Sequence, residues 1–390
     1  MEYQRKTVTL SPENSETPLD SVASWVTPTR LFFVRNHFPV PEVDAATWEL
    51  AIEGLVSRPQ RWSFAALSAM PQHSVFATVE CAGNGRSFLV PKAAGVQWGA
   101  GAIGHAEWTG VRLRDLLQAA GLKPGATEVV FEGADRGTEP DHPTPMNFSR
   151  SLPIAKALDP DTLVALRMNG DWLEPNHGAP MRLFVPGWYG VASVKWLRTV
   201  RVIDHEYPGY FQTVKYSIDR TSGSGKERVP LGPGIVKSEI LQPAPEATLG
   251  LGTHRMAGLA WAGEEPVARV EVSTDGGRTW SDAQLKGLQQ PYSWCQWEAN
   301  WQASRPGEYS LLARASTASG QTQPLTYDGD NLGYLINLVI PRVVRVAESH
   351  AVQPVPTSGS EWVDYMEAFA EANTHRGLDV ELALTSGDGI

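Results

Sequence analysis

The sequence predicts an α+β domain followed by an all-β sandwich, with a further segment at each end. Its 390 residues exceed what one ordinary hydrophobic core requires, so two domains are expected. Up to about residue 243, short strand patterns mix with a few helical ones without a regular βαβ alternation, which favours an α+β fold over a doubly wound sheet. From there to residue 346 only strand patterns occur, at intervals typical of a small sandwich.

The α+β domain is expected over residues 26–243, after a polar arm over 1–25 that lies on the surface. Ser63 is placed to cap a short helix, and apolar residues at helical spacing over 111–120 predict a second helix. Alternating apolar residues predict short strands at 48–56, 128–132 and 181–185. Residues 217–245, which contain glycines, serines and several prolines, are expected to form a loop.

The sandwich domain is expected over residues 244–346. Residues 267–273 alternate between apolar and polar side chains and are followed by the turn signal Asp275-Gly276-Gly277. Further strands are expected at 292–301 and 308–316. No motif with a chemical role occurs here, so packing or oligomerisation is the expected role. The C-terminal extension, 347–390, is predicted to contain an amphipathic helix from the spacing of Trp362, Tyr365, Met366 and Phe369.

Composition excludes several classes of function. A net charge of −10 argues against binding to nucleic acid or to an anionic membrane. The N-terminal residues show no apolar leader and no twin arginine, and a cytoplasmic location is expected. The two cysteines, Cys81 and Cys295, lie far apart and form no C-x-x-C motif. Tryptophan is unusually frequent, with 14 residues, and such rings suit interfaces or the walls of a cofactor cavity.

The most informative motif is Glu80-Cys81-Ala82-Gly83-Asn84-Gly85-Arg86, at the end of an alternating apolar run. The small residues beside Cys81 leave a thiolate open to whatever lies above the strand. A thiolate favours a soft metal, and an arginine nearby favours an oxyanion. One thiolate cannot build a zinc or iron–sulfur site by itself. Cys81 is therefore either an inert buried residue or the ligand of a metal whose other ligands come from a cofactor.

Most standard signatures are missing from the sequence. There is no G-x-G-x-x-G after a strand, no G-x-S-x-G, no H-E-x-x-H and no C-x-x-C-H, and Ser224-Gly225-Lys226 is followed by a glutamate where a P-loop needs Ser or Thr. What remains are basic and polar residues in loops rich in glycine and proline. Such loops bind phosphate-bearing cofactors through backbone amides and cationic side chains, and they occur at 33–41, 176–182 and 186–196.

Four blocks taken together resemble the sulfite oxidase family. They are Arg35-Asn36-His37 with Pro39-Val40-Pro41, then Glu80 to Arg86, then His177-Gly178-Ala179-Pro180-Met181-Arg182, then Val194-Lys195-Trp196-Leu197. They occur in the family's order with similar separations, and the resemblance covers about residues 25–345. It implies the sulfite oxidase fold and molybdenum bound by a pterin dithiolene and by one cysteine thiolate, which would be Cys81. It also implies an immunoglobulin-like dimerisation domain, and hence a homodimer.

The resemblance also carries roles to individual residues. It implies that the molybdopterin and its phosphate are held by Phe33, Arg35, His37, Asp135, His177, Arg182, Ser193 and Lys195. Arg35 and Arg86 would also face the substrate oxyanion, and Trp98 would line that pocket. Tyr216 is the better match for the family's active-site tyrosine, and Tyr210 is the alternative.

Two departures from the family pattern concern the substrate pocket. Gly85 stands where the animal enzymes carry a second arginine. The second domain usually adds another arginine, yet none occurs between Arg278 and Arg305. Arg150 is a candidate substitute.

The resemblance implies an enzyme that oxidises sulfite to sulfate by oxygen-atom transfer at Mo-molybdopterin. No haem, flavin or NAD is expected, so electrons would pass to an external acceptor, a cytochrome or dioxygen. Three alternatives stay open: a reductase of the nitrate or sulfoxide type, a non-catalytic molybdopterin carrier, and a cofactor-free scaffold with an inert Cys81.

Overall fold

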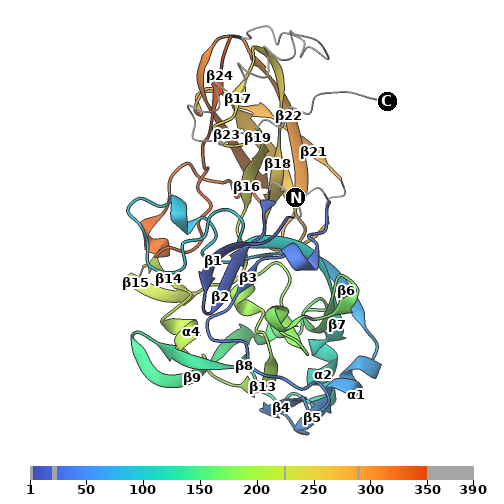
Figure 1. Ribbon diagram of the computed structural model, residues 1–390. Helices are drawn as coiled ribbons and strands as arrows, with labels where there is room; N and C mark the ends of the chain where they lie inside the picture. The colour runs from blue at the N-terminus through green and yellow to red at the C-terminus, as the bar shows by residue number, and fades with distance from the viewer. Residues whose placement is uncertain (1–2, 20–23, 224, 288–289, 349–390) are drawn as a thin grey trace, which may run out of the picture.

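The computed structural model describes residues 3–19, 24–223, 225–287 and 290–348. The first domain contains the α-helices and the strands up to residue 230, and the second contains strands from residue 237 to residue 346 (Figure 1). The predicted order, an α+β domain followed by an all-β domain, is therefore confirmed. No helix in the described part of the chain is long and apolar enough to cross a membrane. The predicted C-terminal helix lies outside the described residues.

Two five-stranded sheets form the framework of the first domain. One consists of β4 (Glu49–Gly54), β5 (Gln60–Ser63), β8 (Glu128–Glu139), β9 (His142–Pro153) and β13 (Leu197–Ile203), in the order β5-β4-β13-β8-β9. The other consists of β6 (His73–Glu80), β7 (Ile103–Arg112), β10 (Leu163–Met168), β11 (Asp171–Trp172) and β12 (Arg182–Phe184). Only the β4–β13 pair is parallel among the described strands of these sheets, as expected for an α+β fold.

The helices of the first domain are short. They are α1 (Phe64–Ala69), α2 (Leu113–Ala120), α3 (Ile154–Ala157) and α4 (Tyr210–Thr213). Single 3₁₀ turns occur at η2 (Thr29–Leu31), η3 (Arg86–Phe88), η4 (Pro175–His177), η5 (Gly190–Ala192) and, in the second domain, η6 (Gly329–Asn331). Both predicted helix boundaries are confirmed: the Ser63 side chain accepts from the Ala66 amide, and Gly121, with φ +73°, ends α2.

The N-terminal segment is more than an arm on the surface. β1 (Lys6–Leu10), β2 (Glu13–Glu16) and β3 (Val34–Arg35) form a three-stranded sheet (Figure 1). In this sheet Asn14 pairs with Arg35. Asn14, Ser15 and Glu16 are buried against the domain. Their polarity favoured a solvated segment, but Asn14 and Ser15 form hydrogen bonds within the protein, and Glu16 forms an ion pair with Lys6 at 3.8 Å.

The prediction of a loop over 217–245 was wrong. β14 (Ser217–Ser222) and β15 (Gly225–Pro230) form an antiparallel hairpin, and β16 (Lys237–Gln242) already belongs to the second domain. Five of the six residues of β15 are exposed, so the hairpin lacks the apolar alternation by which strands are recognised.

The second domain packs two sheets around an apolar core that includes Met256, Val270, Trp297 and Leu311. One sheet pairs β16 with β18 (Gly252–Trp261), β22 (Cys295–Ala303) and β21 (Gln284–Lys286), in that order. The other has the order β17 (Thr248–Leu249), β24 (Arg342–Val346), β23 (Gly307–Thr317), β19 (Val267–Ser273) and β20 (Ser281–Asp282). β19 coincides with the strand predicted at 267–273.

Candidate active site

Two adjoining cavities meet at Cys81. The first contains about 700 Å³ of space between atoms and the second about 880 Å³. Four residues line both: Arg35, His37, Cys81 and Tyr216. They come from β3, from the loops that follow β3 and β6, and from the residue before β14. The structure thus brings together four residues that are up to 181 positions apart in the sequence.

The first cavity collects the residues predicted to hold the cofactor. Its lining includes Phe33, Arg35, His37, Cys81, Asp135, His177, Arg182, Ser193 and Lys195. The second cavity is lined by Arg86 and Trp98, which were predicted to face the substrate, and by Tyr334 and Leu332 from the second domain. Apart from Arg35, His37 and Cys81, which line both cavities, the residues predicted to hold the cofactor line the first cavity, and those predicted to face the substrate line the second.

A tight turn after β6 positions Cys81. The Cys81 amide donates to Ala102 O at 2.9 Å, and its carbonyl accepts from the Asn84 amide at 2.8 Å. Gly85, in the left-handed region with φ +94°, turns the chain into η3. Cys81 is 7% exposed, and burial raises the pKa of its thiol, while the Arg35 and Arg86 cations oppose that shift. A soft cation bound at Sγ would displace the thiol proton outright.

Arg86 occupies a slot made by two glycines. A Cβ at Gly83 would lie 2.3 Å from its Nη2, and one at Gly95 would lie 2.8 Å from its Nη1. Its Nε donates to Gly333 O at 3.0 Å and its Nη1 to Val96 O at 2.8 Å. The guanidinium carbon also lies 5.4 Å from the centre of the Tyr334 ring. These contacts fix a buried cation at the wall of the second cavity.

Tyr216, and not Tyr210, lies at the junction of the cavities. Arg35 Nη2 donates to Tyr216 Oη at 3.3 Å, and His37 Nε2 is hydrogen-bonded to the same oxygen. Burial raises the pKa of Tyr216 to about 12, so the phenol is protonated at neutral pH. Burial, with the neighbouring cations Arg35 and Lys195, lowers the pKa of His37 well below its usual value, so the imidazole is neutral. Tyr210 is bonded to Asp141 and lines neither cavity.

The far end of the first cavity is strongly cationic. Arg182 donates from Nη1 to His177 O at 3.0 Å and from Nη2 to Ser193 O at 2.8 Å. Burial lowers the pKa of Arg182 to about 9, and burial together with Arg182 lowers the pKa of Lys195 well below its usual value. Buried cations of this kind are stabilised by an anion. Arg182 and Lys195 therefore suit the phosphate group of a pterin cofactor.

Asp135 supports the same fit. Burial raises the pKa of this carboxyl to about 6, and the Lys195 ammonium opposes the rise. Its Oδ1 is buried and has no hydrogen-bond partner among the described residues. A buried acceptor of this kind is costly unless it is paired, and the N–H groups of a pterin ring would pair it.

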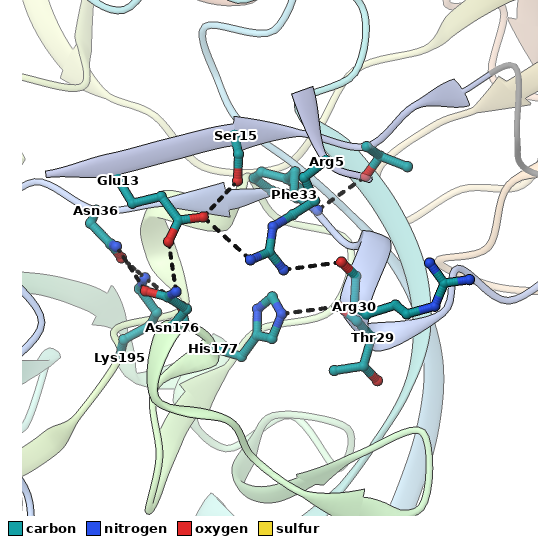
Figure 2. Close-up of polar contacts among 11 residues, drawn as sticks. Arg5, Glu13, Ser15, Thr29, Arg30, Phe33, Asn36, Asn176, His177 and Lys195 are labelled. Atoms are coloured by element: carbon teal, nitrogen blue, oxygen red, sulfur yellow. Dashed lines mark hydrogen bonds and ion pairs between the residues drawn. The ribbon is translucent and has the colours of Figure 1, made fainter. Parts of the chain in front are cut away.

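The N-terminal hairpin is hydrogen-bonded to residues that line this end of the cavity, as Figure 2 shows for Glu13 and Asn176. Glu13 Oε2 accepts from Asn176 Nδ2 at 2.8 Å, and its Oε1 accepts from Arg5 at 3.3 Å. Asn176 O in turn accepts from Lys195 Nζ at 3.0 Å. On the adjacent strand pair, Asn14 Oδ1 accepts from Arg35 Nη1 at 3.2 Å. Sequence reasoning missed Glu13 and Asn14 because they lie in a segment without apolar signal.

The structure does not bring Arg150 to the substrate cavity. Arg150 has no exposed surface, and its guanidinium donates to the carbonyls of Phe211 and Leu231. It lines neither cavity. The further cations that line the second cavity are Lys215 and Arg228, which are partly exposed.

Comparison with known proteins agrees with this geometry. Residues 37–211 match the oxidoreductase molybdopterin binding domain, and residues 235–339 match the Mo-co oxidoreductase dimerisation domain. Sulfite oxidase of Gallus gallus is 37% identical over 80% of this chain and 71% of its own length. Sulfite oxidase of Arabidopsis thaliana is 32% identical over 80% of this chain and 86% of its own length.

Two other comparisons define the extent of the similarity. The chain spans about 58% of the mitochondrial sulfite oxidase of Drosophila melanogaster, which is 35% identical over 81% of this chain. The solved structure of the sulfane dehydrogenase SoxCD from Paracoccus pantotrophus superposes with a TM-score of 0.76 and 30% identity, covering 89% of this chain and 91% of that one. With a molybdopterin-binding domain followed by a dimerisation domain, and with relatives above 30% identity that it covers over more than two thirds of their length, the chain belongs to the sulfite oxidase family of molybdopterin-dependent oxidoreductases.

Proposed function

We propose that this protein is a molybdenum-dependent enzyme that oxidises sulfite to sulfate. One observation carries the proposal: a cavity suited to an anionic pterin meets a second cavity lined by Arg35 and Arg86 at the Cys81 thiol. Lys215 and Arg228, which line the second cavity and are partly exposed, add two cations on its solvent side. The sulfite oxidases among its relatives support this substrate class.

The residues of the first cavity would hold molybdopterin. Cys81 Sγ would bind the metal, Arg182 and Lys195 would neutralise the phosphate, and Asp135 Oδ1 would accept from the pterin ring. When bound, the cofactor supplies two-electron oxygen-atom transfer, which no amino-acid side chain provides.

The residues of the second cavity would bind and orient the substrate. Arg35 and Arg86 place two cations beside Cys81, and this local charge attracts a doubly charged anion against the protein's net charge of −10. Tyr216, protonated below a pKa of about 12, presents a hydrogen-bond donor at the same place. The rings of Trp98 and Tyr334 line this cavity and would keep bulk water away from the substrate.

The overall reaction converts sulfite and one water molecule into sulfate, two protons and two electrons. A separate carrier would accept the electrons one at a time, and the protons would leave through the solvated side of the second cavity. We also propose that the protein acts as a homodimer through its second domain, which the match of residues 235–339 to a dimerisation domain supports.

Sulfite-dependent reduction of ferricyanide tests the proposal in the full chain loaded with molybdenum. Arg86→Ala is expected to lose about 100-fold in kcat/KM while retaining its metal, by analogy with removal of one charged transition-state donor. Tyr210→Phe, outside both cavities, is the matched control and should retain its activity. A metal-loaded wild type without sulfite turnover would reject sulfite as the substrate. Equal turnover by wild type and Arg86→Ala would reject the role of this arginine.

A further inference from the structure

A buried ion pair joins the second domain to the loop that carries Cys81. Lys237, the first residue of β16, places its Nζ 3.5 Å from Glu80 Oε1 at the end of β6, and the two side chains are only 2% and 8% exposed. Trp261 of β18 donates from Nε1 to the other carboxylate oxygen at 2.9 Å. Both carboxylate oxygens of the glutamate directly adjacent to Cys81 therefore contact the second domain, and Oε1 also accepts from Asn84 Nδ2 at 3.0 Å within the loop.

The same loop is held by the second domain at further points. Lys237 Nζ also donates to Asn84 O at 3.3 Å. The Leu335 amide donates to Ala82 O at 3.1 Å, and Gly333 O accepts from Arg86 Nε at 3.0 Å. These contacts bracket Cys81 from the residue before it to the arginine that ends the motif.

Holding the two domains together does not by itself require a buried ion pair at this position. A buried ion pair contributes little to stability relative to a well-packed apolar pair, because desolvation of both charges offsets their attraction. Another pair, Lys156 of α3 with Glu264, joins the domains at 2.7 Å and leaves its carboxylate 44% exposed. Lys156 also contacts Asp159 and the Tyr292 ring, and none of these partners belongs to residues 80–86. Both ion pairs connect the two domains, but only Lys237–Glu80 involves the loop that carries Cys81.

We propose that Lys237 and Glu80 are positioning residues: through this ion pair the second domain fixes the loop that places the Cys81 thiolate relative to the Arg86 guanidinium. The inference rests on the proposed function, because the loop's two ends then carry the metal ligand and a substrate cation. A loop released from Lys237 would shift the substrate relative to the metal without emptying the cofactor cavity.

The test compares Lys237→Met, Glu80→Gln, Lys237→Met/Glu80→Gln and Lys237→Arg with the control Lys156→Met, in the full molybdenum-loaded chain. The measurements are metal content, sulfite kcat/KM, thermal unfolding and the electron paramagnetic resonance spectrum of the half-reduced metal. We expect each single uncharged variant to retain molybdenum, to lose at least tenfold in kcat/KM and to change the spectrum. The loss of kcat/KM in the double variant should be about as large as in either single variant, because all three variants remove the same ion pair. Lys237→Arg should recover most of the activity, and Lys156→Met should affect unfolding alone.

An unchanged spectrum and unchanged kcat/KM in Lys237→Met, with a shift in unfolding like that of Lys156→Met, would overturn the proposal. If Lys237→Met fails to fold, Trp261→Phe removes one hydrogen bond to Glu80 and keeps the ring, and the same two readouts must change. A wild type that holds molybdenum but does not turn over sulfite would reject the proposed function alone, because the spectral comparison of the variants still decides the positioning role.

Discussion

Space left by glycine decides where Arg86 can lie. A Cβ at Gly83 would approach the Arg86 guanidinium to 2.3 Å, and because the atoms it meets are the end of a flexible side chain, the arginine would move before the backbone does. The role of the small residues around Cys81 is thus specific: they admit a guanidinium beside the thiol.

Gly83→Ala is therefore predicted to raise the KM for sulfite at least tenfold while molybdenum stays bound. Steady-state kinetics at matched metal content measure this effect. Gly250→Ala is the control, because a Cβ there meets no atom within 4 Å and the backbone is not left-handed. An unchanged KM in Gly83→Ala would show that Arg86 does not bind the substrate.

At the scale of elements, the N-terminal hairpin β1–β2 supports the wall of the first cavity through hydrogen bonds to two residues that line it, Asn176 and Arg35. Glu13 connects Arg5, on β1's side of the hairpin, to Asn176, whose carbonyl accepts from Lys195. This carboxylate also stabilises the charged form of Lys195, against the burial that lowers its pKa.

Glu13→Gln is predicted to weaken retention of the cofactor, with loss of at least half of the bound pterin after prolonged dialysis of the purified protein. Fluorescence of the released and oxidised pterin measures it. Glu42→Gln, on an exposed loop, is the control. Equal retention by both variants would contradict a role for the hairpin in supporting the cavity wall.

How much of the structure was predictable depends on whether the signal was local. Ser63 and Gly121 mark helix ends through contacts within a few residues, and β19 shows a clear alternation, so these were predicted. The hairpin β14–β15 was missed because its exposed strands lack alternation. Arg150 was the candidate substitute for a substrate arginine, yet it donates to two backbone carbonyls in the interior. Its partners are 61 and 81 residues away, and no local pattern reveals them.

The residues of the candidate site also divide into those that sequence motifs reveal and those that they do not. Family motifs indicated the residues of the first cavity, which the structure brings together. The residues contributed by the second domain, Lys237 and Tyr334, stand outside every motif because their roles arise only when the two domains pack.

At the scale of the whole molecule, aromatic rings and a buried histidine form part of the domain junction. His105 of β7 is completely buried, lies 4.3 Å from Trp25 and 5.6 Å from Trp294 between ring centroids, and is hydrogen-bonded to Ser293 at 3.0 Å. Burial lowers the pKa of His105 to about 4. Because the unfolded chain binds this proton near pH 6.5, it holds more protons than the folded chain between pH 6.5 and pH 4.

Stability is therefore predicted to fall as the pH drops through that window, with about 2 kcal/mol of the loss between pH 7 and pH 5 due to His105. Urea unfolding of the cofactor-free chain at the two pH values measures the loss. His105→Gln keeps a side chain that can hydrogen-bond to Ser293 but cannot titrate. Its loss of stability between pH 7 and pH 5 should therefore be about 2 kcal/mol smaller than that of the wild type. The same pH dependence in both proteins would contradict the assignment.

The proposed chemistry of this protein depends on Cys81 being the ligand through which the chain binds molybdenum. The most direct test is the number of sulfur atoms bound to the metal, measured by X-ray absorption on wild type and Cys81→Ser purified from a host that makes the cofactor. We predict about one molybdenum per chain in the wild type, and one sulfur ligand fewer in Cys81→Ser. A wild type without molybdenum, or the same sulfur count in both proteins, would contradict it.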